Sequence, residues 1–423
     1  MTATAVSAAA AVPSFAPPAA APRIAAGSPE FKRTNRALFF GGFSCFALLY
    51  CVQPLMPVLS HEFALTATQS SMVLSISTGA LAFALLASSV LSERLGRKTL
   101  MVAALALSAV LTVLCAFSQG YGQLLALRAV MGLTLGGIPA IAMAYLGEEI
   151  EPASLGLSMG LYISGSAFGG MAGRVVSSVL SDYFSWRLAL AAMGVSGLFA
   201  AWEFWRSLPQ SRHFTPSRDG WRAWPAAVKS HMSDRAMPWL FLLAFLLMGA
   251  YVSLYNYINY RLQAAPYGLG QSAMGAISFM YLLGMYSSVW SGRLADRMGR
   301  RGVLWAVMTI MIGGLLLTLS SSLVLILLGI ALYTFGFFAT HSVASSWVGR
   351  RALSAKAVAS ALYLFCYYMG SSVVGSATGV MWGRGGWNGV VAVLGAALML
   401  ALVVALRLRQ VAPVGQGELA QAG

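Results

Sequence analysis

Charged residues are scarce in this 423-residue sequence. They make up 9% of the chain, whereas a soluble protein has about 25%. Hydrophobic residues make up 58%, so the chain cannot cover a water-exposed surface with polar side chains. Acidic residues are the rarest charges, with 12 against 27 lysines and arginines, and the net charge is +15. The basic residues lie between apolar runs and form no basic face, which argues against nucleic-acid binding and favours a bilayer as the solvent.

Several motifs of catalysis and metal binding are also missing. The four cysteines form no C-x-x-C pair and all lie in apolar runs, which argues against a disulfide or a metal site. There is no G-x-x-x-x-G-K-[ST] loop and no H-E-x-x-H motif, so direct use of ATP and zinc chemistry are not indicated. No nucleophile–base pair is recognisable from spacing. We therefore predict that the protein is not an enzyme and has neither a metal nor a cofactor.

Twelve apolar segments of about 20 residues follow one another from Ala37 onward. The segments are continuous, which is typical of membrane helices and not of the alternating strands of a barrel. The sequence therefore predicts an all-α integral membrane protein with twelve transmembrane helices. The predicted spans are 37–59, 70–91, 99–117, 122–146, 155–180, 186–206, 238–262, 271–293, 302–319, 322–347, 357–382 and 387–408.

The basic residues predict the orientation of these spans. Of the 27 lysines and arginines, 22 lie on the side of the N-terminus, three lie on the other side, and Arg128 and Arg174 lie inside spans. Because lysine and arginine gather in cytoplasmic loops, both termini are predicted to be cytoplasmic. The predicted boundaries are a disordered Ala/Pro-rich tail at 1–34, a first half at 35–206, a cytoplasmic linker at 207–237, a second half at 238–408 and a tail at 409–423.

One short charged segment occurs twice. Residues 93–98 read ERLGRK and residues 296–301 read DRMGRR, so the copies are separated by 203 residues, about half of the chain. A Gly-Ser pair recurs at a similar separation, in Gly165-Ser166 and Gly370-Ser371. Such repeats predict two pseudo-symmetric six-helix halves, an architecture of secondary transporters.

These motifs resemble those of the major facilitator superfamily over about residues 35–410. Within that family the sequence is similar to the drug:proton antiporter group, and there to its YnfM-like, sugar-efflux-type branch. The loop pattern G-x-x-x-D-R-x-G-R-R/K is complete in the second copy, whereas Ser89 and Glu93 replace its glycine and aspartate in the first. The other matching segments are Tyr50 with residues 53–57 (QPLMP) in span one and Arg128 with Gly132 in span four.

The fifth span carries the remaining match. Its segment GSAFGG at 165–170 resembles the antiporter motif G-P-x-x-G-G, with Ser166 in place of the proline. The substitution weakens the inference of antiport, because the proline forms part of the hinge of that motif. The glycines Gly165, Gly169 and Gly170 are compatible with close helix packing and with flexing.

The resemblance implies that the charged loops brace the outward-facing state on the cytoplasmic side. A glycine between charged residues permits a tight turn, and the acids at the end of span four are expected to pair with Arg94 or Arg97. The alternative is that these charges only direct topology. The candidate gate residues are Glu93, Arg94, Gly96, Arg97, Glu148, Glu149, Gly292, Asp296, Arg297, Gly299 and Arg300.

The resemblance also implies that spans one, four, seven and ten line a substrate cavity. Tyr251, Tyr255 and Asn259 share one helix face, and rings with amides suit an amphipathic organic substrate. The alternative for this face is an aromatic belt at the membrane surface. The candidates for substrate binding or coupling are Gln53, Arg128, Tyr251, Tyr255, Asn256, Asn259 and His341.

Two interpretations are open for each of three polar residues inside predicted spans. An arginine inside a span is costly, so Arg128 and Arg174 either contact substrate or hydrogen-bond to the backbone. The sequence favours a functional role for Arg128 and a structural one for Arg174, which lies nearer a span end. His341 either carries a proton or packs in the helix bundle.

Together these features predict a secondary active transporter that works by alternating access. The expected activity is proton-coupled efflux of a drug, sugar or metabolite, with the proton gradient as energy source. Import or facilitated transport is the alternative, and a non-transporting receptor is a more distant one. The twelve acids all lie in tails, in loops or near span ends, which weakens the case for proton coupling. The expected partners are a small molecule, protons and the lipid bilayer of a bacterial inner membrane, with a monomeric chain.

Overall fold

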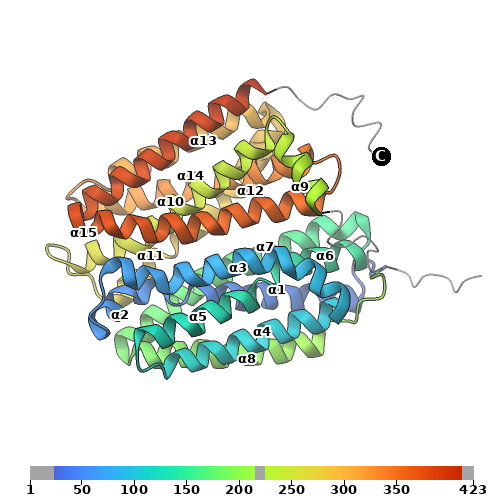
Figure 1. Cartoon of the computed structure of the whole chain (residues 1–423), viewed down its shortest axis with the longest axis horizontal. Helices are drawn as coiled ribbons and strands as arrows, with labels where there is room; N and C mark the ends of the chain where they lie inside the picture. The colour runs from blue at the N-terminus through green and yellow to red at the C-terminus, as the bar shows by residue number, and fades with distance from the viewer. Residues whose placement is uncertain (1–22, 215–223, 412–423) are drawn as a thin grey trace, which may run out of the picture.

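The computed structural model describes residues 23–214 and 224–411, except for the side chains of residues 89, 90 and 92–95. The described residues are almost entirely helical (Figure 1). The first half contains α1 (Pro29–Tyr50), the 3-10 helix η1 (Gln53–Leu55), α2 (Met56–Glu62), α3 (Ala67–Leu95), α4 (Arg97–Ala116), α5 (Tyr121–Leu135), α6 (Pro139–Glu149), α7 (Pro152–Tyr183) and α8 (Trp186–Ser207).

The second half repeats this pattern after the helix α9 (Trp224–Ser233). It contains α10 (Met237–Gln263), α11 (Gln271–Ile277), α12 (Met280–Met298), α13 (Arg300–Leu317), α14 (Leu323–Arg351) and α15 (Lys356–Gln410). Ten helical segments of the described chain are long and apolar enough to cross a membrane. One of them, α15, holds two spans, because Gly386 has non-helical backbone angles (φ 54°, ψ −140°). With the 32-residue α7 the described chain has the twelve predicted spans.

Three spans are interrupted. Span one breaks between α1 and η1, span four between α5 and α6, and span eight between α11 and α12. Pro54 and Pro139 follow the first two breaks, where a proline has no N–H to continue the preceding helix. The hydropathy pattern of the sequence, which averages over 20 residues, does not show these breaks.

The spans lie side by side and the described chain ends emerge at the same end of the bundle (Figure 1). We call this end the terminal face, and the other end, which carries Glu62 and Gly386, the opposite face. The loops of both charged repeats lie on the terminal face, at Gly96 and Gly299. Large apolar side chains are exposed along the outside of the bundle, including Phe83, Phe199 and Tyr286, as expected for a surface in contact with lipid.

The predicted tail at residues 1–34 is too long. Residues 1–22 lie outside the described residues, but the Ile24 N–H donates to Glu149 O (2.8 Å) and Ile24 O accepts from the Glu151 N–H (3.2 Å). The chain then enters α1 at Pro29, with the Ser28 side chain accepting from the Phe31 N–H. The prediction was wrong for residues 23–34, because composition does not register backbone pairing or a helix cap. Part of the predicted linker, residues 215–223, also lies outside the described residues.

Glycines allow α7 to pack closely on α1. A Cβ at Gly165, Gly169 or Gly173 would lie 2.3, 1.9 or 2.5 Å from a backbone oxygen of α1. In the second half a Cβ at Gly370 would lie 2.0 Å from Phe245 O of α10. The spacing of four residues is the small-residue pattern that brings membrane helices into contact. The structure therefore supports the packing role for Gly165 and Gly169.

This packing generates a test of stability. We expect Gly169→Ala to lower the unfolding temperature in detergent, because the new methyl group overlaps the backbone of α1 and overpacking costs about 1–3 kcal/mol. The matched control is Gly160→Ala on the same helix, where the site is exposed and nothing lies within 4 Å of the new Cβ. Equal melting temperatures for the two variants would contradict the packing role.

Candidate functional site

Arg128 is held by backbone carbonyls at the break of span one. Its side chain is 1% exposed. Nε donates to Val73 O (3.1 Å), Nη1 to Leu48 O (3.2 Å) and Nη2 to Leu49 O (2.7 Å). Carbonyls in the last turn of a helix lack intrahelical partners and carry partial negative charge. Arg128 supplies hydrogen-bond donors to the last turn of α1, which supports the interpretation that this arginine binds the backbone.

Gln53, Arg174 and Asn256 form one chain of hydrogen bonds, which we call the junction relay. Arg174 Nε donates to Gln53 Oε1 (2.6 Å), and Gln53 Nε2 donates to Asn256 Oδ1 (2.7 Å). The relay links η1, α7 and α10, so it joins the two halves. Gln53 and Asn256 are 203 residues apart, the separation of the two charged repeats. Each lies in the first span of its own half.

Further contacts join the halves beside the relay. Among the described residues, Gln271 Nε2 donates to Pro54 O (2.6 Å), and the Ser60 and Tyr260 hydroxyls are 2.7 Å apart. The Ser272 N–H donates to the Asp182 carboxylate (3.0 Å). All of these residues lie towards the opposite face, so the halves are fastened together on that side.

Aromatic side chains extend from the relay towards the terminal face. The Tyr251 and Phe337 rings are parallel with centroids 3.7 Å apart, and Phe337 is parallel to the His341 ring at 6.0 Å. Tyr333 stacks on the other side of Tyr251 at 6.4 Å. Tyr333, Phe337 and His341 follow one another at intervals of four residues on α14, so they share one face. We call these four rings the aromatic column.

The structure places the remaining cavity candidates around this column. Tyr255 is buried, and its hydroxyl is 2.9 Å from the Thr334 hydroxyl. His341 Nδ1 is 2.9 Å from the Tyr363 hydroxyl, which gives the packing interpretation a partner. Asn259 is buried one turn nearer the opposite face and takes no part in the relay. Because these tyrosines make buried contacts between helices, they do not form an aromatic belt at the membrane surface.

Two aromatic residues at the relay were not among the site candidates, although one of them, Tyr50, belongs to the span-one motif. The guanidinium carbon of Arg174 lies 4.2 Å from the Tyr50 ring centroid and 4.8 Å from that of Tyr281. The Tyr281 ring also packs edge-on against Tyr251 at 5.8 Å, which connects Arg174 to the aromatic column. Tyr281 had no motif or periodic signal, because its position depends on the break of span eight.

The gate candidates form ion pairs within each half. Arg97 Nε donates to Glu148 Oε2 (2.6 Å), which matches the expected pairing of the loop with the end of span four. Asp296 contacts Arg300 (2.8 Å) and Arg350 (3.2 Å). The side chains of Glu93 and Arg94 lie outside the described residues.

The glycines of these loops have the backbone conformation that a tight turn requires. Gly96 and Gly299 have φ values of +80° and +84°, a region that disfavours a Cβ. Gly292 is half-buried beside α14, and Arg297 is exposed. A role of the two loops in gating stays a prediction.

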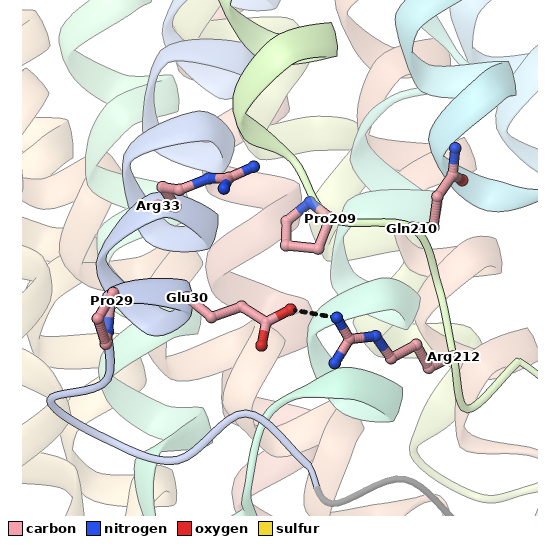
Figure 2. A pocket seen from close by; sticks show the side chains of 6 residues that line it. All are labelled: Pro29, Glu30, Arg33, Pro209, Gln210 and Arg212. Atoms are coloured by element: carbon pink, nitrogen blue, oxygen red, sulfur yellow. Dashed lines mark ion pairs between the residues drawn. The ribbon is translucent and has the colours of Figure 1, made fainter.

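Glu149 anchors the linker to the first half. Its buried carboxylate accepts from the Ser211 hydroxyl (2.6 Å) and from the N–H groups of Arg212 (2.6 Å) and His213 (2.9 Å). Beside it, Glu30 of α1 pairs with Arg212 at 3.0 Å across a surface pocket, which also involves Pro29, Arg33, Pro209 and Gln210 (Figure 2). These contacts fix the start of the linker to the first half. The sequence carried no signal for them, since they join residues about 60 positions or more apart.

Arg128 is expected to contribute to stability. In Arg128→Ala, Leu49 O loses its donor from Arg128, while Leu48 O and Val73 O keep the Cys51 thiol and the Ser77 hydroxyl as donors. A buried group left unsatisfied costs about 1–3 kcal/mol. We expect a lower unfolding temperature in detergent. The decrease should be smaller in Arg128→Lys, because the lysine ammonium can donate to some of the same carbonyls. A variant with wild-type melting but no transport would instead assign Arg128 to coupling or substrate contact.

Asp296 is expected to affect the rate of cycling. In Asp296→Asn the pairs with Arg300 and Arg350 are weakened, but stability changes by less than about 1 kcal/mol because the carboxylate is exposed. We expect slower transport in liposomes with unchanged substrate affinity.

The control for Asp296 is Asp234→Asn, which removes another acid near the terminal face. Asp234 pairs with Arg351 at 2.6 Å outside the repeated loop. Burial would raise the pKa of Asp234, but hydrogen bonds from Arg351 and from the Ala236 and Met237 N–H groups outweigh it and lower the pKa. Asp234→Asn should therefore reduce stability near neutral pH while transport by the folded fraction continues. Normal turnover in Asp296→Asn would refute the gating role.

Comparisons with known proteins agree with this architecture. The family model described as Major Facilitator Superfamily matches residues 38–375. The chain is 47% identical to "Inner membrane transport protein YnfM" of Escherichia coli (strain K12), over 91% of this chain and 92% of that protein. It is also 47% identical to "Uncharacterized MFS-type transporter YybF" of Bacillus subtilis (strain 168), over 89% of this chain and 93% of the relative.

A solved structure supports the fold independently. The crystal structure of a bacterial homologue of the human lysosomal transporter Spinster, in an inward-facing and unoccupied conformation, covers 94% of this chain and 96% of its own. The TM-score is 0.73 and the sequence identity is 14%, so this likeness concerns the fold alone. The predicted all-α membrane fold and the predicted family are thus confirmed, and membership supports a carrier rather than an enzyme. This chain belongs to the major facilitator superfamily.

Proposed function

We propose that this membrane transporter exports a small organic compound in exchange for protons, by alternating access between its two halves. The observation that carries the proposal is the junction relay. Gln53 and Asn256 lie in the first spans of the two halves, and they bind each other where the halves meet. A hydrogen bond of this kind between the halves can open by rotation of one half against the other, which is the motion of alternating access.

The two faces differ in a way that suits this motion. The hydrogen bonds between the halves lie towards the opposite face among the described residues, whereas the ion pairs Arg97–Glu148 and Asp296–Arg350 of the charged loops each stay within one half. Opening the opposite face would require breaking hydrogen bonds between neutral groups and one backbone contact to Asp182. Such bonds contribute about 1 kcal/mol each, so substrate binding energy can offset their loss.

His341 is the proposed site of proton binding. No acid of the sequence lies in the middle of a span, and histidine titrates near neutral pH. His341 belongs to the aromatic column and contacts Tyr363. Protonation would place a charge between stacked rings and so favour a rearrangement of α14 against α15.

Facilitated transport or import is the second candidate, and one observation favours it. Ser166 replaces the proline of the antiporter motif, and its hydroxyl donates to Tyr162 O (3.0 Å) within α7. The helix runs from Pro152 to Tyr183 without a break. The hinge that this motif supplies in antiporters is therefore missing here.

The proposed placement is the inner membrane of a bacterium, as in the name of the Escherichia coli relative. The terminal face carries the basic loops and would face the cytoplasm. In that orientation the contacts between the halves close the outer side.

Reconstitution into liposomes tests the coupling. Purified protein is exposed to labelled drugs, sugars and organic acids, and we expect flux of one of these compounds to rise when a pH gradient is imposed. His341→Gln should abolish the response to the gradient while substrate binding continues, because a glutamine amide does not titrate. Flux that ignores the gradient in the wild type would establish facilitated transport instead.

A further inference from the structure

Arg174 is a buried cation whose partners in the described chain are neutral. Its side chain is 3% exposed. It donates to an amide oxygen of Gln53 (2.6 Å) and to Gly170 O (2.6 Å), and the ion pairs of the described residues do not include it. A buried charge without a counter-charge costs several kcal/mol. Such a charge is retained where it serves binding or structure.

The donors of Arg174 are only partly used, in contrast to those of Arg128. A guanidinium has five N–H groups. All three nitrogens of Arg128 donate to backbone carbonyls. In Arg174, Nε and Nη1 donate, whereas Nη2 has no hydrogen-bond partner among the described residues. Every nitrogen of Arg128 therefore has a partner, whereas one nitrogen of Arg174 has none among the described residues.

The unused donor lies on the edge of Arg174 that suits a carboxylate. The guanidinium carbon of Arg174 lies over the Tyr50 and Tyr281 rings, at 4.2 and 4.8 Å from their centroids, so a ligand would reach the cation through its N–H groups. Nε and Nη2 point the same way along one edge, and this fork matches the two oxygens of a carboxylate. A single amide oxygen, Gln53 Oε1, occupies the Nε side of that edge.

The directions of the hydrogen bonds in the relay also decide whether its Asn256 end is left with a donor or an acceptor. Because Gln53 Oε1 accepts from Arg174, its Nε2 must donate, and Asn256 Oδ1 receives that bond. Asn256 Nδ2 is then left as a donor, and it is buried without a partner. The free capacity at both ends of the relay consists of donors, which suits an anion and opposes a cation.

The aromatic surroundings indicate the body of such a ligand. Tyr281 contacts Arg174 and packs against Tyr251, Tyr255 and Phe338 at centroid distances between 5.5 and 5.8 Å. Rings supply flat apolar area for an amphipathic molecule. Tyr251 packs beside Tyr255 and Tyr281, and its buried hydroxyl offers one more polar group.

We propose that Arg174 binds the carboxylate of an organic acid with an aromatic or similarly flat apolar body, and that such acids are the substrate class. This rests on the proposed transport function and specifies its cargo. A carboxylate on the Nε–Nη2 edge replaces Gln53 Oε1. Gln53 then loses its partner in the relay, so binding at Arg174 loosens the contact between the halves.

Ligand-induced thermal shifts of the full-length protein in detergent test the binding site. The probes are benzoate, phenylacetate and cinnamate, each beside its uncharged amide, with sodium chloride as an inorganic control. We expect at least one acid to stabilise the wild type while its amide and chloride do not. We expect the affinity for that acid to fall about 10- to 100-fold in Arg174→Gln, as for loss of a charge-assisted hydrogen bond.

Two further variants make the result interpretable. Arg187→Gln is the matched control, because Arg187 also lies over an aromatic ring, Trp186, but is exposed and pairs with Glu62 on the opposite face. Arg174→Lys keeps the charge without the fork and should bind with intermediate affinity. If Arg174→Gln does not fold, as judged by its melting curve without ligand, the binding test is made with Arg174→Lys instead.

The outcomes separate binding from transport. The proposal is overturned if none of the three acids stabilises the protein, if amides or chloride stabilise it equally, or if Arg174→Gln and Arg174→Lys bind the acid like the wild type. Acids that bind but do not cross liposomes would leave the anion site standing and refute the transport function. Flux of neutral or cationic compounds that is unaffected by Arg174→Lys would keep transport and refute the substrate class.

Discussion

The break in span one leaves carbonyl groups in a region without water, and the donation from Arg128 makes that break possible. Backbone groups inside a bilayer must find partners within the protein. Pro54 has no N–H, and the helix therefore cannot continue past Tyr50 in the regular way. Arg128 donates to Leu48 O and Leu49 O and ties this turn to α3 through Val73 O. Without that cation the chain direction after Tyr50 would not be fixed.

The position of Gln53 follows from this break. Gln53 begins the 3-10 helix η1, whose direction differs from a continued α1, and it meets Arg174 of α7 and Asn256 of α10. The second half has no matching break, since α10 is continuous from Met237 to Gln263. Gln53 and Asn256 are thus presented by different backbones, a broken helix and an intact one. This asymmetry lets a glutamine and an asparagine bind each other across a duplicated fold.

The sequence predicted the twelve spans, the duplication and the tight turns of the charged loops. These features follow from local composition and from residue spacing, which the chain displays directly. It did not predict the contacts of Glu149 or Arg174, because each depends on how distant helices pack. Glu149 lies one residue from Glu148, yet it binds the linker while Glu148 binds Arg97.

The chemistry of the contacts on the two faces matches the surroundings in which they must break. Asp296 and Arg350 are exposed to water, where an ion pair contributes about 0–1 kcal/mol and can separate at little cost. The junction relay is buried, and breaking an ion pair there would leave an uncompensated charge at about 3–5 kcal/mol. Neutral amides avoid this cost, since Gln53 and Asn256 separate without creating a charge. Arg174 keeps the Gly170 carbonyl and the Tyr50 ring on its own half when the relay opens. A cation that stays partly stabilised within one half can receive a ligand while the halves move apart.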